Sequence, residues 1–250
     1  MPLYFIGLGL NNEKDITLNG LEAVKKCDIV YLENYTSILN CSKESLEKFY
    51  GKKIILARRS LVEADENEII ENAKTQNVAF LVAGDPFGAT THVDLMLRAK
   101  KDGIKCHVVH NTSILNAAGI TGIQLYKFGK TTSIPLENEN VEAPYDILKG
   151  NMGIGAHTLF LLDLNPEDEK FLSINNAIRY LLKVELKRNE KIFSEKTLCV
   201  GCARIGSESQ AIKAGAAKYL LKFDFGKAPY CLIVPGKLHF MEEEALNMWK

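Results

Sequence analysis

Residues 78–86 have the sequence VAFLVAGDP, in which an apolar run is followed by a Gly-Asp-Pro turn. The run Val78–Ala83 contains no polar residue, and a strand that is apolar on both faces is typical of the middle of a parallel sheet covered by helices. Gly, Asp and Pro favour turns, so the strand is expected to end there. A helix is expected to begin near Thr91, which gives the strand, turn and helix order of an α/β protein.

The same order recurs on both sides of this segment. Apolar residues at helical or strand spacing predict strands at Leu3–Leu8, Ile29–Leu32, Lys53–Ala57 and Ile104–His110, and helices at Thr17–Cys27, Lys43–Phe49, 65–76 and Thr91–Lys101. Asp65 and Glu68 have the spacing of a capping box at the start of the third helix. These alternations predict a doubly wound α/β unit over roughly the first 110 residues.

In the second half the strands are fewer and the connections are longer. The pattern predicts strands at Thr131–Leu136, His157–Leu164, Thr197–Ala203 and Tyr230–Val234, and helices at Ser113–Ala118, Ile174–Leu186, Gln210–Leu221 and Met241–Trp249. The segment 137–155 contains Pro144 and several glycines, so we expect a loop with a short helix. The change in character predicts two α/β domains, residues 1–112 and 113–250.

Composition argues against several function classes. The 250-residue chain has 31 Lys+Arg and 31 Asp+Glu, and a zero net charge lacks the basic footprint of a nucleic-acid binder or a polybasic membrane anchor. No apolar stretch is long enough to predict a spanning helix. The apolar segment Met1–Leu10 has no preceding basic residue and is followed at once by charges, unlike a signal peptide. The six cysteines are therefore expected to be reduced thiols in the cytoplasm.

No metal site is expected. Cys199 and Cys202 have C-x-x-C spacing, but they lie in a predicted strand, where residues three apart point to opposite faces. His107 and His110 have the same spacing on another predicted strand. We expect these residues to be buried or separate, without a structural zinc ion.

Two charged groups are open to two interpretations. Arg58 and Arg59 follow a predicted strand and could meet an anionic partner or form an ordinary surface pair. Glu242–Glu244 is more typical of a solvated helix start than of a metal site.

Three predicted strand ends carry residues that suit a ligand. Gly7–Leu10 begins like a dinucleotide-binding fingerprint, but Asn12 stands where the third glycine is needed, so a plain turn or a close backbone approach by a ligand both remain open. Gly84–Gly88 and His110–Ile114 follow two further strands, and Ser113 is also a natural helix cap. Ligands of open α/β sheets bind beyond the carboxyl ends of the strands, so three such turns at one edge predict a binding site.

Taken together, the motifs resemble those of the diphthine synthases, a group of tetrapyrrole-methylase-like enzymes that use S-adenosylmethionine (SAM). The resemblance covers essentially the whole chain and rests on Tyr4–Leu10, Lys14–Thr17, Gly84–Pro86 with Ala89–His92, Gly119–Gly122 with Tyr126–Lys130, His157–Leu159 with Leu162–Asp163, and Ala203–Gly206. It implies two α/β domains with SAM in the cleft between them, and usually a homodimer.

The resemblance also implies which residues contact the cofactor. The positions that match are Leu10, Asp85, Gly88, Ser113, Ile114, Leu162, Ile205 and Tyr230. Several of these contacts are expected to use backbone groups, and Asp85 is expected to hold SAM, with S-adenosylhomocysteine (SAH) as the product. Tyr230 departs from the family, in which histidine is expected. No residue is assigned as a general base.

The implied substrate is translation elongation factor 2. One of its histidines carries a 3-amino-3-carboxypropyl group, and the family methylates the amino nitrogen repeatedly. Eukaryotic members also methylate the carboxylate, and the blocks Phe49–Gly51 and Val82–His92 are closer to those members. Two alternatives stay open: a related methyltransferase that acts on a small tetrapyrrole, and a non-catalytic relative that binds the elongation factor.

Overall fold

The computed structural model describes residues 1–63 and 68–250. The chain divides into two units, Met1–Leu115 (unit 1) and Asn116–Lys250 (unit 2), whereas the sequence placed the boundary between residues 112 and 113. The helix that was predicted to begin the second domain is α6 (Ile114–Ala117), and the boundary between the units falls within it.

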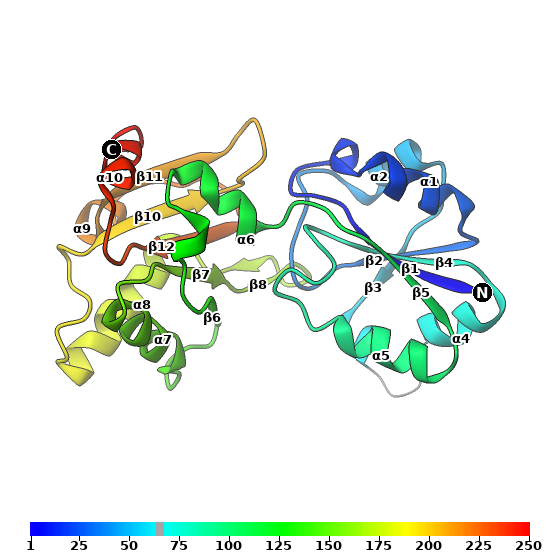
Figure 1. Cartoon of the computed structure of the whole chain (residues 1–250), viewed down its shortest axis with the longest axis horizontal. Helices are drawn as coiled ribbons and strands as arrows, with labels where there is room; N and C mark the ends of the chain where they lie inside the picture. The colour runs from blue at the N-terminus through cyan, green and yellow to red at the C-terminus, as the bar shows by residue number, and fades with distance from the viewer. Residues whose placement is uncertain (64–67) are drawn as a thin grey trace. The chain divides into compact units, whose positions relative to one another are not determined.

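Unit 1 contains a five-stranded parallel sheet with the order β3-β2-β4-β1-β5 (Figure 1). The strands are β1 (Pro2–Gly7), β2 (Ile29–Glu33), β3 (Ile55–Ala57), β4 (Val78–Val82) and β5 (Lys105–Val109). Every residue of β4 is buried, and β4 is the middle strand, as its apolar sequence predicted. The predicted doubly wound sheet is thus confirmed.

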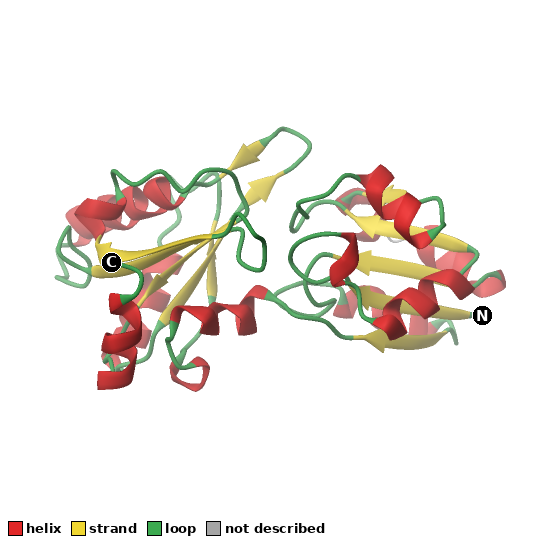
Figure 2. Ribbon diagram, turned by 90° about the horizontal axis from the view of Figure 1, so that it is seen from above, coloured by secondary structure: helices red, strands yellow, loops and turns green. Residues whose placement is uncertain are grey.

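Helices cover both faces of this sheet (Figure 2). On one face α1 (Leu18–Lys26) and α2 (Lys43–Tyr50) pack over residues such as Ile6 and Leu81. On the other face α4 (Glu68–Thr75) and α5 (Val93–Lys101) pack over Phe5 and Phe80. The 3-10 helix η1 (Glu13–Asp15) precedes α1, and α3 (Arg59–Glu63), which the sequence did not predict, follows β3.

Side-chain caps explain where several helices begin. Thr17 accepts a hydrogen bond from the backbone N–H of Gly20 at the start of α1, and Ser42 accepts one from Ser45 at the start of α2. The capping box predicted at Asp65 lies outside the described residues, and the described part of that helix is α4.

Unit 2 contains a mixed five-stranded sheet with the order β11-β10-β12-β7-β6. The strands are β6 (Thr132–Ile134), β7 (Thr158–Leu162), β10 (Leu198–Ala203), β11 (Ala211–Ala216) and β12 (Tyr230–Val234), with a small hairpin of β8 (Leu164–Asn165) and β9 (Lys170–Phe171). Only β6 and β7 pair in parallel. The helical elements are η2 (Ala118–Thr121), η3 (Leu125–Lys127), α7 (Ala143–Gly153), α8 (Ile174–Arg188), α9 (Ala217–Leu220) and α10 (Phe240–Asn247). Helices α7 and α8 contribute to one apolar core with the sheet.

One prediction for unit 2 is wrong. The helix expected at Gln210–Leu221 is the strand β11 followed by the single turn α9. Helix propensity is a weak preference, and pairing with β10 from Ala203↔Ala211 to Leu198↔Ala216 overrides it. The segment 137–155, expected to be a loop with a short helix, contains the eleven-residue helix α7, and its proline occupies the first turn, where no N–H partner is lost.

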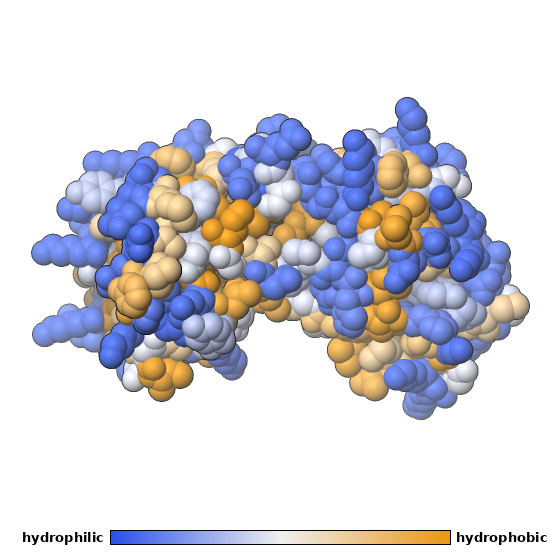
Figure 3. Space-filling view, turned by 45° about the horizontal axis from the view of Figure 1, so that its top comes forward, coloured by the Kyte–Doolittle hydropathy of each residue, from blue (hydrophilic) through white to orange (hydrophobic). Residues whose placement is uncertain are grey.

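The six cysteines carry free thiols, and Cys202 and Cys231 lie opposite each other on β10 and β12. Within residues 1–63 and 68–250 there is no group of three His, Cys, Asp or Glu side chains that could hold a metal ion. In the same two ranges, every helix is too short or too polar to cross a bilayer. Large apolar side chains that are exposed include Leu18 on unit 1 and Ile154 on unit 2. Figure 3 shows apolar residues (orange) among hydrophilic ones on one face.

Candidate functional site

The carboxyl ends of β1 and β4 meet in a surface made of backbone. Gly84 N donates a hydrogen bond to Gly9 O at 2.7 Å, and Gly9 N donates to Gly84 O at 3.2 Å. Both glycines have positive φ angles, 74° at Gly9 and 78° at Gly84, which other residues rarely adopt. The two glycines therefore let the turns after β1 and β4 approach each other closely at this edge of the sheet.

Asp15 fixes the turn that follows β1. Its Oδ2 atom accepts hydrogen bonds from the backbone N–H groups of Asn11 at 2.9 Å and of Leu10 at 3.3 Å. A Cβ atom at Gly9 would lie 2.7 Å from the Cβ atom of Asp15, so the carboxylate reaches this turn only because residue 9 is glycine. Leu10, a predicted cofactor contact, is thus held by a side chain that the sequence analysis did not single out.

Asp85 connects the loops that follow β4 and β5. Its Oδ1 accepts from Phe87 N at 2.9 Å, and its Oδ2 accepts from Asn111 N at 3.1 Å and lies 2.8 Å from His110 Nδ1. Burial alone would raise the pKa of Asp85, but these hydrogen bonds and the nearby His110 more than offset it, and the pKa lies below its usual value. The ionised carboxylate therefore joins two loops and keeps a negative charge at this edge.

Asn111 joins the β5 loop to the β1 turn. Its Nδ2 donates to Gly7 O and to Asp15 O, both at 3.0 Å. A Cβ atom at Gly7 would lie 2.7 Å from the Cβ atom of Asn111 and 2.6 Å from Gly84 O, so the contact requires glycine. Sequence reasoning missed Asn111 as a linking residue, although it lies within one of the three segments that were singled out.

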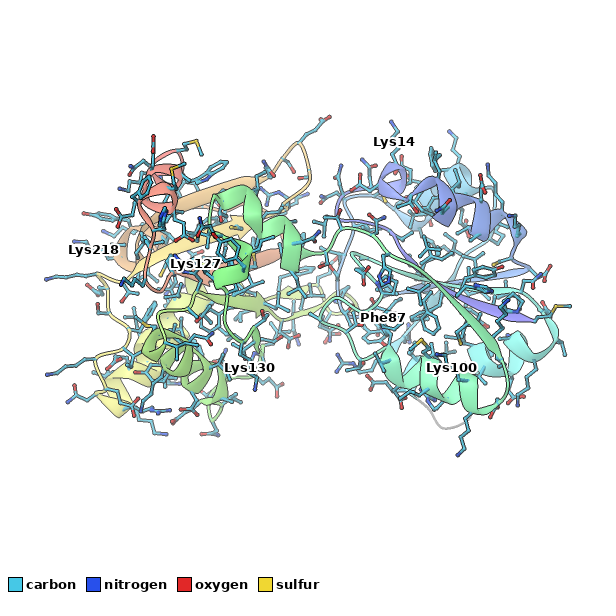
Figure 4. The ribbon with its side chains drawn as sticks, viewed as in Figure 1. Lys14, Phe87, Lys100, Lys127, Lys130 and Lys218 are labelled. Atoms are coloured by element: carbon cyan, nitrogen blue, oxygen red, sulfur yellow. The ribbon has the colours of Figure 1, made fainter. Side chains whose placement is uncertain are left out.

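Gly88 and Ser113 bring the β4 and β5 loops into direct contact. A Cβ atom at Gly88 would lie 2.9 Å from the Cβ atom of Ser113, whose buried side chain also accepts a hydrogen bond from Leu115 N at 3.2 Å. Phe87, labelled in Figure 4, lies in the same loop and packs its ring against Phe5 at a centroid distance of 5.6 Å. The structure thus brings the five predicted unit 1 residues together at one edge of the sheet: Leu10, Asp85, Gly88, Ser113 and Ile114.

The three predicted residues of unit 2 lie near one end of its own sheet. Leu162 ends β7, Tyr230 begins β12, and Ile205 follows β10. Ala203 pairs with Tyr230, and Cys231 pairs with Leu161, so these chain segments are adjacent. The Tyr230 hydroxyl donates to Gly226 O, and burial raises the pKa of this hydroxyl.

Arg204 organises the loops beside Ile205 and Tyr230. Its Nη1 donates to Phe225 O at 2.9 Å and also to Lys227 O. On the other side Nε and Nη2 donate to Ser209 O at 3.0 and 2.8 Å. One guanidinium thereby holds two loops that flank the predicted cofactor residues of unit 2.

A separate buried cluster corrects the interpretation of Glu242–Glu244. Glu243 and Glu244 are exposed, but the Glu242 side chain is fully buried and its carboxylate accepts four hydrogen bonds, from Gln124 N, His157 Nε2, His239 N and Lys127 Nζ. Gly236 N donates to the other nitrogen of His157, which leaves the proton on Nε2. Burial raises the pKa of Glu242, but these partners overcome it and lower the pKa to about 2. The cluster is closed to a ligand and anchors α10; Figure 4 labels Lys127.

Comparisons with known proteins give the family. Residues 2–220 match the model of the tetrapyrrole (corrin/porphyrin) methylases. A probable diphthine methyl ester synthase of Arabidopsis thaliana is 48% identical, with 99% of this chain and 98% of that protein covered, and a diphthine synthase of Methanococcus maripaludis is 47% identical, with 98% and 97% covered. A crystal structure of a diphthine synthase superposes with a TM-score of 0.92 at 39% identity and covers 100% of this chain and 96% of its own. The chain belongs to the tetrapyrrole methylase family, in its diphthine synthase group.

Proposed function

We propose that this methyltransferase uses SAM to methylate the amino group of the 3-amino-3-carboxypropyl-histidine of translation elongation factor 2, a step of diphthamide biosynthesis. The carboxylate is a further acceptor, as the name methyl ester synthase states for some relatives. The observation that carries the proposal is the glycine-lined, negatively charged edge of the unit 1 sheet in a chain that matches diphthine synthases over nearly its full length.

The residues at this edge fit SAM by shape and charge. SAM carries a sulfonium and an ammonium group, and Asp15 and Asp85 place two carboxylates beside the turns where it would lie. We propose that the adenosine group lies against the backbone of the turns at Gly9 and Gly84. We propose Leu162, Ile205 and Tyr230 of unit 2 as further contacts.

The bound SAM supplies a methyl group that is already electrophilic, so the chain's task is alignment. The amine must attack in line with the methyl carbon and the sulfur, and positioning of this kind contributes about 7–11 kcal/mol. The hydrogen bonds of Asp15, Asp85 and Asn111 to backbone groups hold the three turns in one arrangement before a ligand binds. The amine proton goes to water, and we assign no side chain as its acceptor.

Binding is tested by thermal unfolding with SAH. At about 100 times its Kd, SAH should stabilise the native state by about 2.7 kcal/mol. For a chain of this size that is a rise in Tm of roughly 5–10 °C. Asp85→Ala should reduce the rise, because the loops after β4 and β5 lose their connection. No shift for the parent protein at saturating SAH would overturn the proposed function.

Catalysis is tested with labelled SAM and elongation factor 2 from cells that lack this enzyme. Label should enter the factor, and a mass spectrum of the modified peptide gives the number of methyl groups and shows whether the ester forms. A tetrapyrrole methyltransferase would leave the factor unlabelled. A non-catalytic relative would bind the factor without an SAH shift. Relatives of 44–49% identity that are named for diphthine favour the protein substrate over both alternatives.

A further inference from the structure

The carboxyl edge of the unit 1 sheet has a second half that the predicted cofactor residues do not use. Those residues follow β1, β4 and β5, whereas β2 and β3 form the other side of the same parallel sheet. Tyr35 follows β2, Arg59 follows β3, and His92 ends the loop after β4. Tyr35 contacts both Arg59 and His92, and we call these three residues the β2–β3 cluster.

The hydroxyl of Tyr35 is oriented by a buried histidine. His92 is 1% exposed, and its Nδ1 lies 3.0 Å from Pro86 O, an atom that can only accept a hydrogen bond. The proton is therefore on Nδ1, and Nε2 accepts the longer bond of 3.5 Å from the Tyr35 hydroxyl. Burial lowers the pKa of His92, which keeps this ring neutral.

A buried carboxyl group holds the backbone of the same residue. Glu33 is 2% exposed and accepts hydrogen bonds from Tyr35 N at 2.7 Å and from Thr36 N and Oγ1, both at 2.6 Å. Burial raises the pKa of Glu33. Burying a carboxyl group and an imidazole around one turn is costly. Side chains whose pKa values are shifted by burial are frequent at functional sites. Here Glu33 and His92 both hold Tyr35 in place.

Arg59 lies over the fixed tyrosine ring and is open to solvent. Its guanidinium carbon is 5.2 Å from the ring centroid of Tyr35, and its side chain is 65% exposed. Its ion pair is with Glu63, at 3.9 Å from Nε, which is a long contact through one atom, and its charge also acts on the buried Glu33. An arginine that is stacked on an aromatic ring keeps its planar fork ready to bind a carboxylate through two hydrogen bonds.

We propose that Arg59, held on Tyr35, binds the carboxylate of the substrate's 3-amino-3-carboxypropyl group and so orients its amine for methylation. The inference rests on the proposed function. The amine and the carboxylate of that group share one carbon atom, so fixing the carboxylate restricts where the amine can lie. The loop of residues 85–92 serves both halves of the edge, because it contains Asp85 and Gly88 as well as Pro86 and His92.

The experiment measures methyl transfer to elongation factor 2 that carries the unmethylated group, together with the Kd of SAH for each variant. Arg59→Gln should raise KM for the factor at least tenfold while the Kd of SAH stays within twofold of the parent value. Arg59→Lys should restore little of the affinity for the factor that Arg59→Gln loses, because an ammonium group cannot form the paired hydrogen bonds. Arg179→Gln is the matched control: Arg179 is exposed on α8 of unit 2, and KM should not change.

Tyr35→Leu is a second, independent variant. It keeps Arg59 but removes its platform, so KM for the factor should rise severalfold with an unchanged Kd for SAH. Thermal unfolding of each variant shows whether the fold is kept, and only variants with the parent Tm are compared.

The outcomes separate the two proposals. If the parent protein transfers no methyl group to the factor, the proposed function fails. If the parent is active and Arg59→Gln keeps the parent KM, the role of Arg59 is refuted. SAM also has a carboxylate, and if Arg59→Gln weakens SAH binding instead, Arg59 holds the donor and the inference is again refuted.

Discussion

Replacing Glu242 by glutamine tests whether the buried cluster anchors α10. The side chain is fully buried, and its carboxylate accepts from Gln124 N at 2.9 Å, His157 Nε2 at 3.0 Å, His239 N at 2.7 Å and Lys127 Nζ. Glutamine has nearly the same shape, but its NH2 group would face one pair of these donors. The change therefore leaves buried N–H groups unpaired and the Lys127 ammonium without its counter-charge.

The expected loss at pH 7 is about 3–5 kcal/mol of unfolding free energy, the usual cost of breaking a buried ion pair. The pKa of Glu242 gives an independent limit. It falls from its ordinary value of 4.5 to about 2 in the folded chain, and at about 1.4 kcal/mol per pKa unit the charge of Glu242 contributes at most about 3.5 kcal/mol of this loss. A carboxylate whose pKa is lower in the folded state than in the unfolded state stabilises the fold fully at pH values above the unfolded-state pKa. This stabilisation is lost as the pH falls through the folded-state pKa. When the pH is lowered from 5 to 3, the difference in unfolding free energy between the parent and Glu242→Gln should thus decrease by up to about 2 kcal/mol.

The assay is urea unfolding at several pH values, followed by circular dichroism and by fluorescence of Trp249, the single tryptophan. Trp249 lies just after α10 and donates to Thr121 O at 3.2 Å, so it reports on the anchored segment. Glu243→Gln on the exposed side of α10 is the matched control and should cost less than about 0.5 kcal/mol. The anchoring role would be refuted if Glu242→Gln also cost less than about 0.5 kcal/mol of unfolding free energy and if this cost did not change with pH.

Three further predictions concern unit 1 and assembly. Asp15→Asn should weaken SAH binding roughly tenfold by calorimetry, since Leu10 N and Asn11 N lose their charged acceptor, and an unchanged Kd would contradict this. Gly7→Ala should cost about 1–3 kcal/mol or more in chemical denaturation, because its Cβ would lie 2.6 Å from Gly84 O; a parent-like midpoint would show that the backbone yields. The homodimer that the family resemblance implies predicts twice the 27.9 kDa chain mass by light scattering, and a monomer at all concentrations would disprove it.

Local sequence predicted most elements of unit 1 because their patterns are local. The all-apolar Val78–Val82 becomes the central strand, and Thr17 and Ser42 cap the helices that follow them. The strand β11 was missed for the opposite reason. Ala214 is its buried residue, the remainder has a helix-like composition, and only pairing with the distant β10 decides its conformation.

The turns of the candidate site could be predicted from the sequence, but the residues that connect these turns could not. Parallel strands end at the same edge of a sheet, so the sequence alone places the turns after its apolar runs at one edge. The residues that connect these turns could not be found in that way, since Asn111 bonds to Gly7 and Asp15, which are about a hundred residues earlier in the chain. The contact of Arg59 with Tyr35 is likewise formed only by the neighbouring positions of β2 and β3.

The hydrogen bonds at this edge give Asp85 a structural role beside the predicted cofactor contact. The family resemblance predicts that Asp85 holds the cofactor, and in the structure its oxygens also accept from Phe87 N and Asn111 N and lie against His110. Asp15 acts in the same manner on the turn that contains Leu10. Both carboxylates thus shape backbone and supply charge, and the surface they shape consists of peptide groups. A site of this kind depends on the residues that hold its turns more than on the side chains that would touch the ligand: the backbone at Leu10 is held by Asp15, and the loop at Gly88 is held by its close contact with Ser113.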